Sequence, residues 1–183
     1  MKYKARLCAH GGMQKWGIDY WETYSTIDNW ISICLLFALT MIHDLESRSI
    51  DFVLAFPQAE LHEDVYMELP FGFDHDGDRS YVMKLNKSIY GLKQASSNWF
   101  DHLTKGLKQR DFFPSKIDPC VYYKDNSVIL VYMDDCIIFS KKSVIDDLIH
   151  SLMNGPENYV LTDKGEIDKY LGVDIDKFKK GSI

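Results

Sequence analysis

The chain has 183 residues, of which 46% are hydrophobic and 14% aromatic, a composition that excludes bulk disorder and allows one domain with a buried core. The net charge of −6 argues against a protein that grips nucleic acid over its whole surface, because phosphate contacts are normally made by an excess of Lys and Arg. The longest apolar stretch, residues 31–42, is too short to span a bilayer, and the N-terminus opens with charged residues rather than a signal peptide. We therefore expect a cytoplasmic protein that does not contact a membrane and whose four cysteines are core thiols.

The first third of the chain contains three predicted elements. Weak alternation predicts a strand over residues 2–9. Helical spacing of large apolar side chains predicts a largely buried helix over residues 29–44, with Trp30, Ile33, Leu36, Phe37 and Met41 on its apolar positions. Residues 49–56 (SIDFVLAF) are a short apolar run with one acid inside it, which indicates a buried strand that ends in a turn at Pro57.

The rest of the chain alternates between helical and strand patterns. In chain order these are an amphipathic helix (88–109), three short strands (120–123, 128–133 and 136–139), a helix from 144 that ends at Gly155-Pro156, and a closing strand (167–175). The last two short strands are separated only by Asp134-Asp135, which predicts a tight hairpin. This order predicts an α+β, ferredoxin-like fold, an antiparallel sheet with helices on one face.

Three aspartates are the most informative residues. Asp134 and Asp135 lie at the predicted hairpin tip, although an Asp-Asp turn also has an ordinary reading, since acids favour turns by bonding nearby backbone amides. Asp51 lies inside an apolar strand, where an isolated ionised carboxylate is costly. In a ferredoxin-like sheet that strand lies beside the hairpin, so the three carboxylates meet. At about 4 Å they repel by roughly 4 kcal/mol per pair at an intermediate dielectric, a cost that a divalent cation would remove.

The absence of His and Cys from this predicted cluster favours Mg²⁺ or Mn²⁺ over zinc. Two such ions activate an attacking hydroxyl and stabilise the leaving oxygen of an in-line displacement at phosphorus. Phosphoryl transfer asks little more of the protein than positioning and charge neutralisation. The cluster therefore favours metal-dependent nucleotidyl transfer, and a nucleotide cyclase on a similar fold remains an alternative.

Several ordered segments together resemble the reverse transcriptase of copia-type LTR retrotransposons, a domain of the Pol polyprotein. The matching segments are YKARLCAHG (3–11), GIDYWETYS (17–25), SIDFVLAFPQAEL (49–61), VYMELPFGF (65–73), KLNKSIYGLKQASSNWF (84–100), IDPCVYY (117–123), VYMDD (131–135) and YLGVDI (170–175). Their order and spacing are those of the family over nearly the whole chain. The resemblance implies an RNA-directed DNA polymerase that extends a primer from dNTPs with two Mg²⁺ or Mn²⁺ ions.

The resemblance assigns roles to matching residues. It implies that Asp51, Asp134 and Asp135 are the catalytic, metal-binding carboxylates. Phe56 falls where the family has an aromatic gate against the sugar 2′-hydroxyl, with plain core packing as its alternative. Gln94 falls where the family contacts the incoming nucleotide at the start of the long helix, although as a bare feature it could equally be a solvated helix residue.

Further residues fall on nucleotide-binding and primer-binding positions of the family. Lys4 and Arg6 correspond to the fingers strand whose basic groups hold the triphosphate. Lys164 falls where related polymerases place a lysine that protonates the leaving pyrophosphate, and its alternative is a solvated loop lysine. Leu171 and Gly172 belong to a segment that resembles the hairpin gripping the primer end.

The resemblance also implies a domain layout and partners. Residues 1–47 and 57–87 correspond to fingers-like parts, and residues 48–56 and 88–178 to the palm, with the thumb expected to be absent. The implied partners are an RNA or DNA template with its primer, dNTPs, and the remainder of a Pol polyprotein, whose RNase H and integrase are not in this chain. The family implies a virus-like particle within the cell.

Some positions depart from the family pattern. His10 and Cys34 stand where family members usually carry Arg, and Gln58-Ala59 stands where Asn-Gly is usual. Each charged hydrogen bond lost near a polyphosphate is expected to cost about 1.5–3 kcal/mol of affinity. An inactive, truncated retroelement remnant is therefore the alternative to an active polymerase.

Overall fold

A computed structural model describes residues 5–25, 29–73, 80–170 and 173–175. The chain divides into two compact units, one made of Met1–Thr26 with Leu54–Gly106 and the other of Ile27–Val53 with Leu107–Ile183. The predicted fingers and palm boundaries stay a prediction. Within the described residues, no helix is long and apolar enough to cross a membrane.

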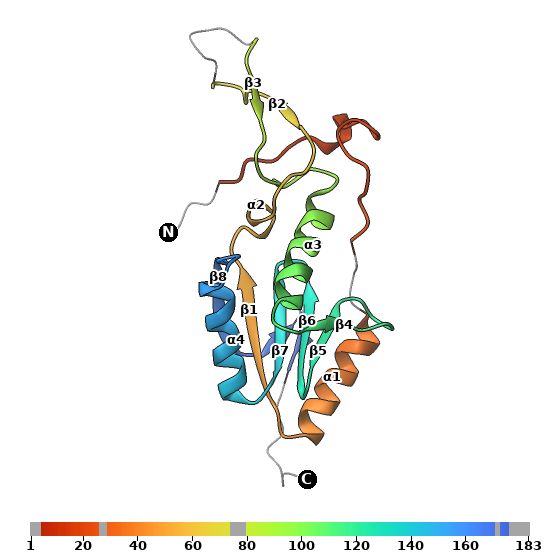
Figure 1. The fold of residues 1–183 in the computed structure, drawn as a ribbon, viewed down its shortest axis with the longest axis vertical. Helices are drawn as coiled ribbons and strands as arrows, with labels where there is room; N and C mark the ends of the chain where they lie inside the picture. The colour runs from red at the N-terminus through yellow and green to blue at the C-terminus, as the bar shows by residue number, and fades with distance from the viewer. Residues whose placement is uncertain (1–4, 26–28, 74–79, 171–172, 176–183) are drawn as a thin grey trace. The chain divides into compact units, whose positions relative to one another are not determined.

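The second unit is built on one six-stranded sheet (Figure 1). Its strands are β1 (Glu46–Phe52), β4 (Phe113–Pro114), β5 (Val121–Lys124), β6 (Ser127–Tyr132), β7 (Asp135–Ser140) and β8 (Leu161–Glu166). Their order is β4-β5-β6-β7-β1-β8, and every neighbouring pair is antiparallel. The predicted mixed fold with an antiparallel sheet is confirmed, and β1 lies beside the β6-β7 hairpin as that fold requires.

Two helices of this unit, α1 (Trp30–Ile42) and α4 (Lys142–Asn154), cover opposite faces of the sheet. Neighbouring residues of a strand point to opposite faces. Phe139 of β7 shares a core cluster with Ile33 of α1, whereas Arg48, the register partner of Ile138, forms an ion pair with Asp146 of α4. Helix α1 therefore packs on the face of the sheet opposite to α4.

Helix α1 matches its predicted range, but it is less buried than its apolar sequence predicts. Its buried residues are Ile33, Leu36 and Thr40, while Trp30 is 50% exposed and Met41 62% exposed. The sheet covers only one side of the helix, so apolar residues on its other sides reach the surface. The cysteines differ from expectation in the same way: Cys120 and Cys136 are buried, but Cys8 and Cys34 are exposed.

The C-terminal part of this unit differs from its prediction. The strand that closes the sheet is β8, which pairs with β1, and not residues 167–175. Those residues contain two short antiparallel strands, β9 (Lys169–Tyr170) and β10 (Val173–Asp174), in a separate sheet. The polar sequence of β8 (LTDKGE) lacks the alternating apolar residues by which a half-buried strand is recognised.

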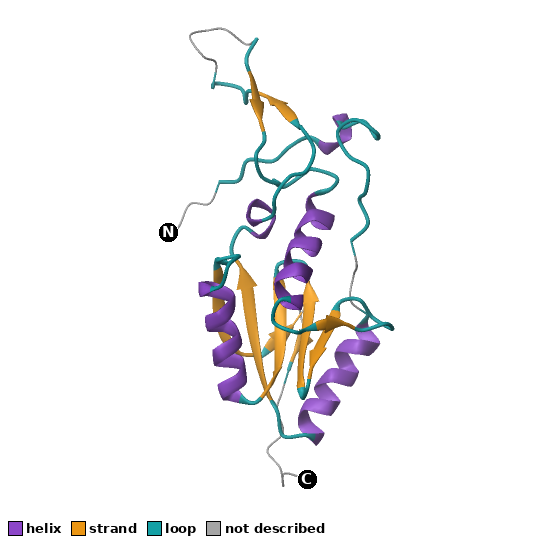
Figure 2. Ribbon diagram, viewed as in Figure 1, coloured by secondary structure: helices purple, strands orange, loops and turns teal. Residues whose placement is uncertain are grey.

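The first unit contains short elements and one long helix (Figure 2). They are the 3₁₀ helix η1 (Gly11–Met13), α2 (Ala55–Gln58), the paired strands β2 (Tyr66–Glu68) and β3 (Val82–Lys84), and α3 (Ala95–Lys108), whose last two residues belong to the second unit. The described residues 5–9 form no strand, and α3 begins seven residues later than predicted. Leu54, at a left-handed φ of 53°, separates β1 from α2. Pro57 therefore lies within the short helix α2 rather than in the predicted turn at the end of a strand.

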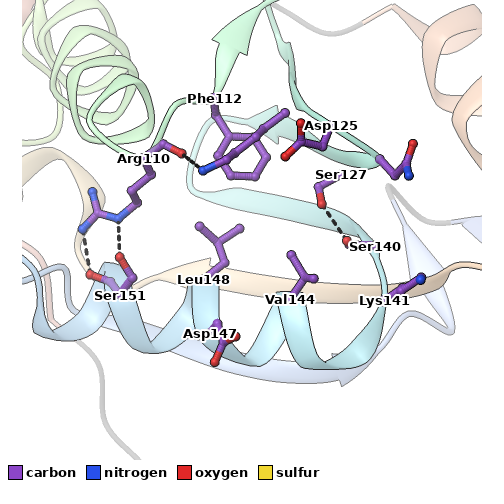
Figure 3. Close-up of a pocket in the computed structure, with 12 residues that line it drawn as sticks. Arg110, Phe112, Asp125, Ser127, Ser140, Lys141, Val144, Asp147, Leu148 and Ser151 are labelled. Carbon is purple, nitrogen blue, oxygen red and sulfur yellow. Dashed lines mark hydrogen bonds between the residues drawn. The ribbon is translucent and has the colours of Figure 1, made fainter.

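A buried arginine ties the chain after α3 to the end of α4. Arg110 donates from Nε to the Ser151 hydroxyl at 2.9 Å and from Nη2 to the Ser151 carbonyl at 2.7 Å. Its Nη1 lies 3.0 Å from Glu157 Oε2, and the two side chains are only 10% and 8% exposed. Figure 3 shows Arg110 at one end of a hollow of about 490 Å³, which none of the predicted site residues lines.

Candidate functional site

Strand pairing brings two of the three predicted carboxylates side by side. Asp51, near the end of β1, is the register partner of Asp135, the first residue of β7. The amide of Phe52 donates to the Asp134 carbonyl at 2.8 Å, which fixes the hairpin tip against the end of β1. The predicted pairing of Asp51 with the hairpin is therefore confirmed for Asp135, and Asp134 follows at the hairpin tip.

The hairpin differs in one detail from the prediction. Asp135 pairs with Tyr132 inside the ladder, so the two turn residues are Met133 and Asp134 rather than Asp134 and Asp135. Met133 takes the left-handed conformation, with a φ of 56°. For a residue other than glycine, the left-handed conformation costs on the order of 1–3 kcal/mol of folding free energy. Such backbone strain is typical of functional sites.

Asp134 is electrostatically unfavourable as it stands. Burial raises the pKa of its carboxyl, and repulsion from Asp135 and Asp51 raises it further, more than offsetting a backbone hydrogen bond and Lys164. A raised carboxyl pKa means that ionisation of Asp134 destabilises the folded protein.

Asp134→Asn is expected to raise the free energy of unfolding at pH 7, by less than about 1 kcal/mol because water screens a half-exposed carboxylate. The cost of ionisation is absent below the ordinary aspartate pKa, grows as pH rises to the raised value and is complete above it. The gain in the variant should therefore shrink as pH falls. Urea unfolding of both proteins between acidic and neutral pH measures it, and equal stabilities at pH 7 would contradict the prediction.

Lys164 joins the other two carboxylates. Its Nζ donates to Asp135 Oδ1 at 2.7 Å and to Asp51 Oδ1 at 3.1 Å. Burial lowers the Lys164 pKa, but the hydrogen bonds with Asp135 and Asp51 outweigh it, so the pKa is raised and the ammonium stays charged at neutral pH. Lys164 lies in strand β8 rather than in a loop and binds both acids, although its side chain is 45% exposed.

The carboxylates do not form a ready-made metal cage. Across the described ranges, no three His, Cys, Asp or Glu side chains come close enough to hold a metal ion. The ammonium of Lys164 instead supplies positive charge to Asp51 and Asp135. It offsets one of the three negative charges, so the cluster keeps an excess of negative charge that suits a cation with oxygen ligands.

The predicted nucleotide-contacting residues that the structure describes in the first unit are Phe56, Gln94 and Arg6. Phe56, in α2, is 9% exposed and packs against Tyr90 with ring centroids 4.8 Å apart. Arg6 is exposed, with its guanidinium carbon 5.2 Å from the centre of the same Tyr90 ring.

Gln94 immediately precedes α3 and is 1% exposed, so the solvated reading of this residue is wrong. Its Nε2 donates to the Asp19 carbonyl at 2.8 Å, and its Oε1 accepts from Gln14 Nε2 at 2.9 Å. These bonds tie the start of α3 to the N-terminal segment. Lys4, Leu171 and Gly172 lie outside the described residues.

Residues 1–182 match the reverse transcriptase (RNA-dependent DNA polymerase) family. The chain belongs to that family. Relatives include the retrovirus-related Pol polyprotein from transposon TNT 1-94 of Nicotiana tabacum, 37% identical over 96% of this chain and 13% of that protein. The Pol polyprotein from transposon RE1 of Arabidopsis thaliana is 33% identical over 98% of this chain and 12% of its own length.

A third relative is the putative transposon Ty5-1 protein of Saccharomyces cerevisiae, 30% identical over 73% of this chain and 44% of that protein. The predicted membership of the copia-type reverse transcriptases is thereby confirmed. The reverse transcriptase chain spans about an eighth of the length of the two plant polyproteins.

The sequence patterns did not single out two residues that lie beside the site of this reverse transcriptase. Arg48 and Asp163 form an ion pair at 2.7 Å next to Lys164. A charged residue three positions before Asp51 falls on the other face of the strand, which sequence alternation could have indicated. The pairing of β8 with β1 depends on long-range contacts that no local pattern records.

Proposed function

We propose that this chain is the RNA-directed DNA polymerase domain of a transposon Pol polyprotein, adding dNTPs to a primer 3′-hydroxyl on an RNA or DNA template. The observation that carries the proposal is the pairing of Asp51 with Asp135 beside Asp134, with Lys164 bound to the first two. Membership of the reverse transcriptase family supports it. The RNase H and integrase of such a polyprotein, and the particle in which it works, belong to the same proposal.

The donor chemistry of the cluster fits divalent cations. Asp51, Asp134 and Asp135 would hold two Mg²⁺ or Mn²⁺ ions, since oxygen ligands suit both metals. Burial raises the pKa of Asp134, and repulsion from Asp135 and Asp51 adds to this effect; bound positive charge would offset that repulsion. Bound there, the ions would supply activation of the primer hydroxyl and stabilisation of the leaving oxygen.

The protein's own groups position the reactants and hold a proton. The β1-β7 pairing fixes the carboxylates in one place, which favours in-line transfer by orientation. Lys164 Nζ holds the proton that the leaving pyrophosphate would take. Arg6, Lys4 and Gln94 are proposed to contact the nucleotide, and Leu171 and Gly172 the primer end.

Primer extension on poly(rA)-oligo(dT) tests the proposal. The chain alone, and the chain joined to flanking polyprotein sequence, are each assayed with Mg²⁺, with Mn²⁺ and with EDTA. We expect metal-dependent extension that Asp134→Asn abolishes. Extension by neither form would reject the polymerase and favour the inactive remnant, towards which His10 and Cys34 point.

Phe56→Val is expected to raise incorporation of ribonucleotides relative to deoxyribonucleotides by about tenfold or more, because it removes the ring proposed to exclude the 2′-hydroxyl. The ratio of kcat/KM for rUTP to that for dTTP measures the effect. Leu103→Val, at a position of α3 that is 1% exposed, is the control for a cavity in the same unit and should leave the ratio unchanged. An unchanged ratio in Phe56→Val would leave Phe56 as a core residue only.

A further inference from the structure

Lys164 is an extra residue in its strand. In the pairing of β8 with β1, Ser49 faces Gly165 and Ile50 faces Asp163, so Lys164 has no register partner. Such a bulge bends the strand and redirects a side chain. Gly165 has a φ of 85°, the left-handed region that favours glycine, and it allows the chain to return to the ladder.

The carboxylate of Asp163 spans this bulge. Its Oδ1 accepts a hydrogen bond from the amide of Gly165 at 2.8 Å, which closes the backbone around Lys164. Its Oδ2 accepts from Arg48 Nη1 at 2.7 Å. Both oxygens of one side chain are therefore used, one on the bulge and one on β1.

Arg48 links that carboxylate to a helix. Its Nη2 lies 3.3 Å from Asp146 Oδ1 on α4, and its side chain is 16% exposed, less than those of its two acidic partners. A guanidinium with two fixed acceptors holds its partners more rigidly than an exposed single pair does. The bulge is thus tied to both a strand and a helix.

The alternation of side chains along β1 places Arg48 on the face of the sheet opposite to the carboxylate cluster. Arg48 and Asp51 are three residues apart, so they point to opposite faces of the sheet. Arg48 and Asp163 therefore reach the cluster only through the backbone of the bulge, which places Lys164 Nζ between Asp51 and Asp135.

We infer that Arg48 and Asp163 are positioning residues for Lys164: they hold the β8 bulge in the shape that keeps its ammonium on Asp51 and Asp135. The inference rests on the proposed function for its catalytic consequence, but its geometric part is independent of any activity. Without Arg48, Asp163 loses its anchor and Lys164 leaves the two carboxylates for much of the time.

The first test reads the position of Lys164 without polymerase activity. The folded chain is treated briefly with acetic anhydride, and acetylation of Lys164 is followed by mass spectrometry in wild type, Arg48→Met, Arg48→Lys and Asp163→Asn. We expect several-fold faster acetylation in Arg48→Met and Asp163→Asn, and a smaller increase in Arg48→Lys. Lys124→Met, which removes the exposed pair with Asp111, is the matched control and should leave the rate at Lys164 unchanged.

The second test is a double-mutant cycle in primer extension. Arg48→Met should lower kcat with little change in KM, and should have no further effect when Lys164 is already replaced by Met, because both changes remove the same function. Unchanged acetylation in both Arg48→Met and Asp163→Asn, with circular dichroism showing folded protein, overturns the inference. Faster acetylation of Lys164 in Arg48→Met and Asp163→Asn than in wild type, together with a wild type that extends no primer, would uphold the positioning and reject the proposed function.

Discussion

Asp51→Asn and Asp135→Asn are each expected to lower the rate of primer extension by on the order of 10³-fold, because each removes charge where the proposed reaction needs fixed electrostatic stabilisation. The two side chains are 33% and 39% exposed and pair with a half-exposed lysine. Their loss should therefore change the free energy of unfolding by less than about 1 kcal/mol. Single-turnover extension with saturating primer-template and dNTP measures the chemical defect.

Asp125→Asn is the matched control for this prediction. Asp125 is exposed in the turn between β5 and β6, with a φ of 50° that asparagine also tolerates. It should extend primers at the wild-type rate. A variant of Asp51 or Asp135 that matched this control would show that the carboxylate cluster is not the polymerase centre.

Arg110→Met is expected to destabilise the chain by about 3–5 kcal/mol, because it leaves the buried carboxylate of Glu157 without its cation. The substitution also removes both hydrogen bonds to Ser151 at the end of α4. Urea unfolding followed by tryptophan fluorescence and by circular dichroism gives the free energy. A loss of about 3–5 kcal/mol would be a large share of the free energy of unfolding of a chain of this size.

Lys124→Met serves as the control for the buried pair as well. Lys124 and Asp111 lie 3.2 Å apart, but their side chains are 39% and 75% exposed. An exposed ion pair is worth about 0–1 kcal/mol. If Arg110→Met cost no more than Lys124→Met, the buried pair would not be a stabilising anchor.

The sheet and the meeting of the aspartates were predictable because apolar runs mark the central strands. Most residues of β6 and β7 are apolar, and Asp51 is conspicuous as the one acid in the apolar run of residues 49–56. The exact turn was not predictable in the same way. Sequence patterns favour Asn, Asp or Gly at a left-handed turn position, whereas here Met133 adopts it and leaves Asp135 in the strand.

The other misjudged elements depend on tertiary contacts. Strand β8 is polar and exposed along most of its length, so its pairing with β1 supplies the structure that its sequence does not indicate. Gln94 is polar, yet its bonds to Asp19 and Gln14 allow its burial. Partners that lie some eighty positions away in the chain cannot be found from local periodicity.

The unpaired position of Lys164 also has a genetic consequence. Removing this one codon would place Asp163 and Gly165 in consecutive register with Ile50 and Ser49, so the β1-β8 ladder would become regular rather than broken. A genomic copy of the transposon could then lose Lys164 in a three-nucleotide deletion, while all strands of the sheet keep their pairing. Such a copy would encode a chain that folds and accumulates but has lost the ammonium between Asp51 and Asp135, and a search for this deletion among related genomic copies would identify it.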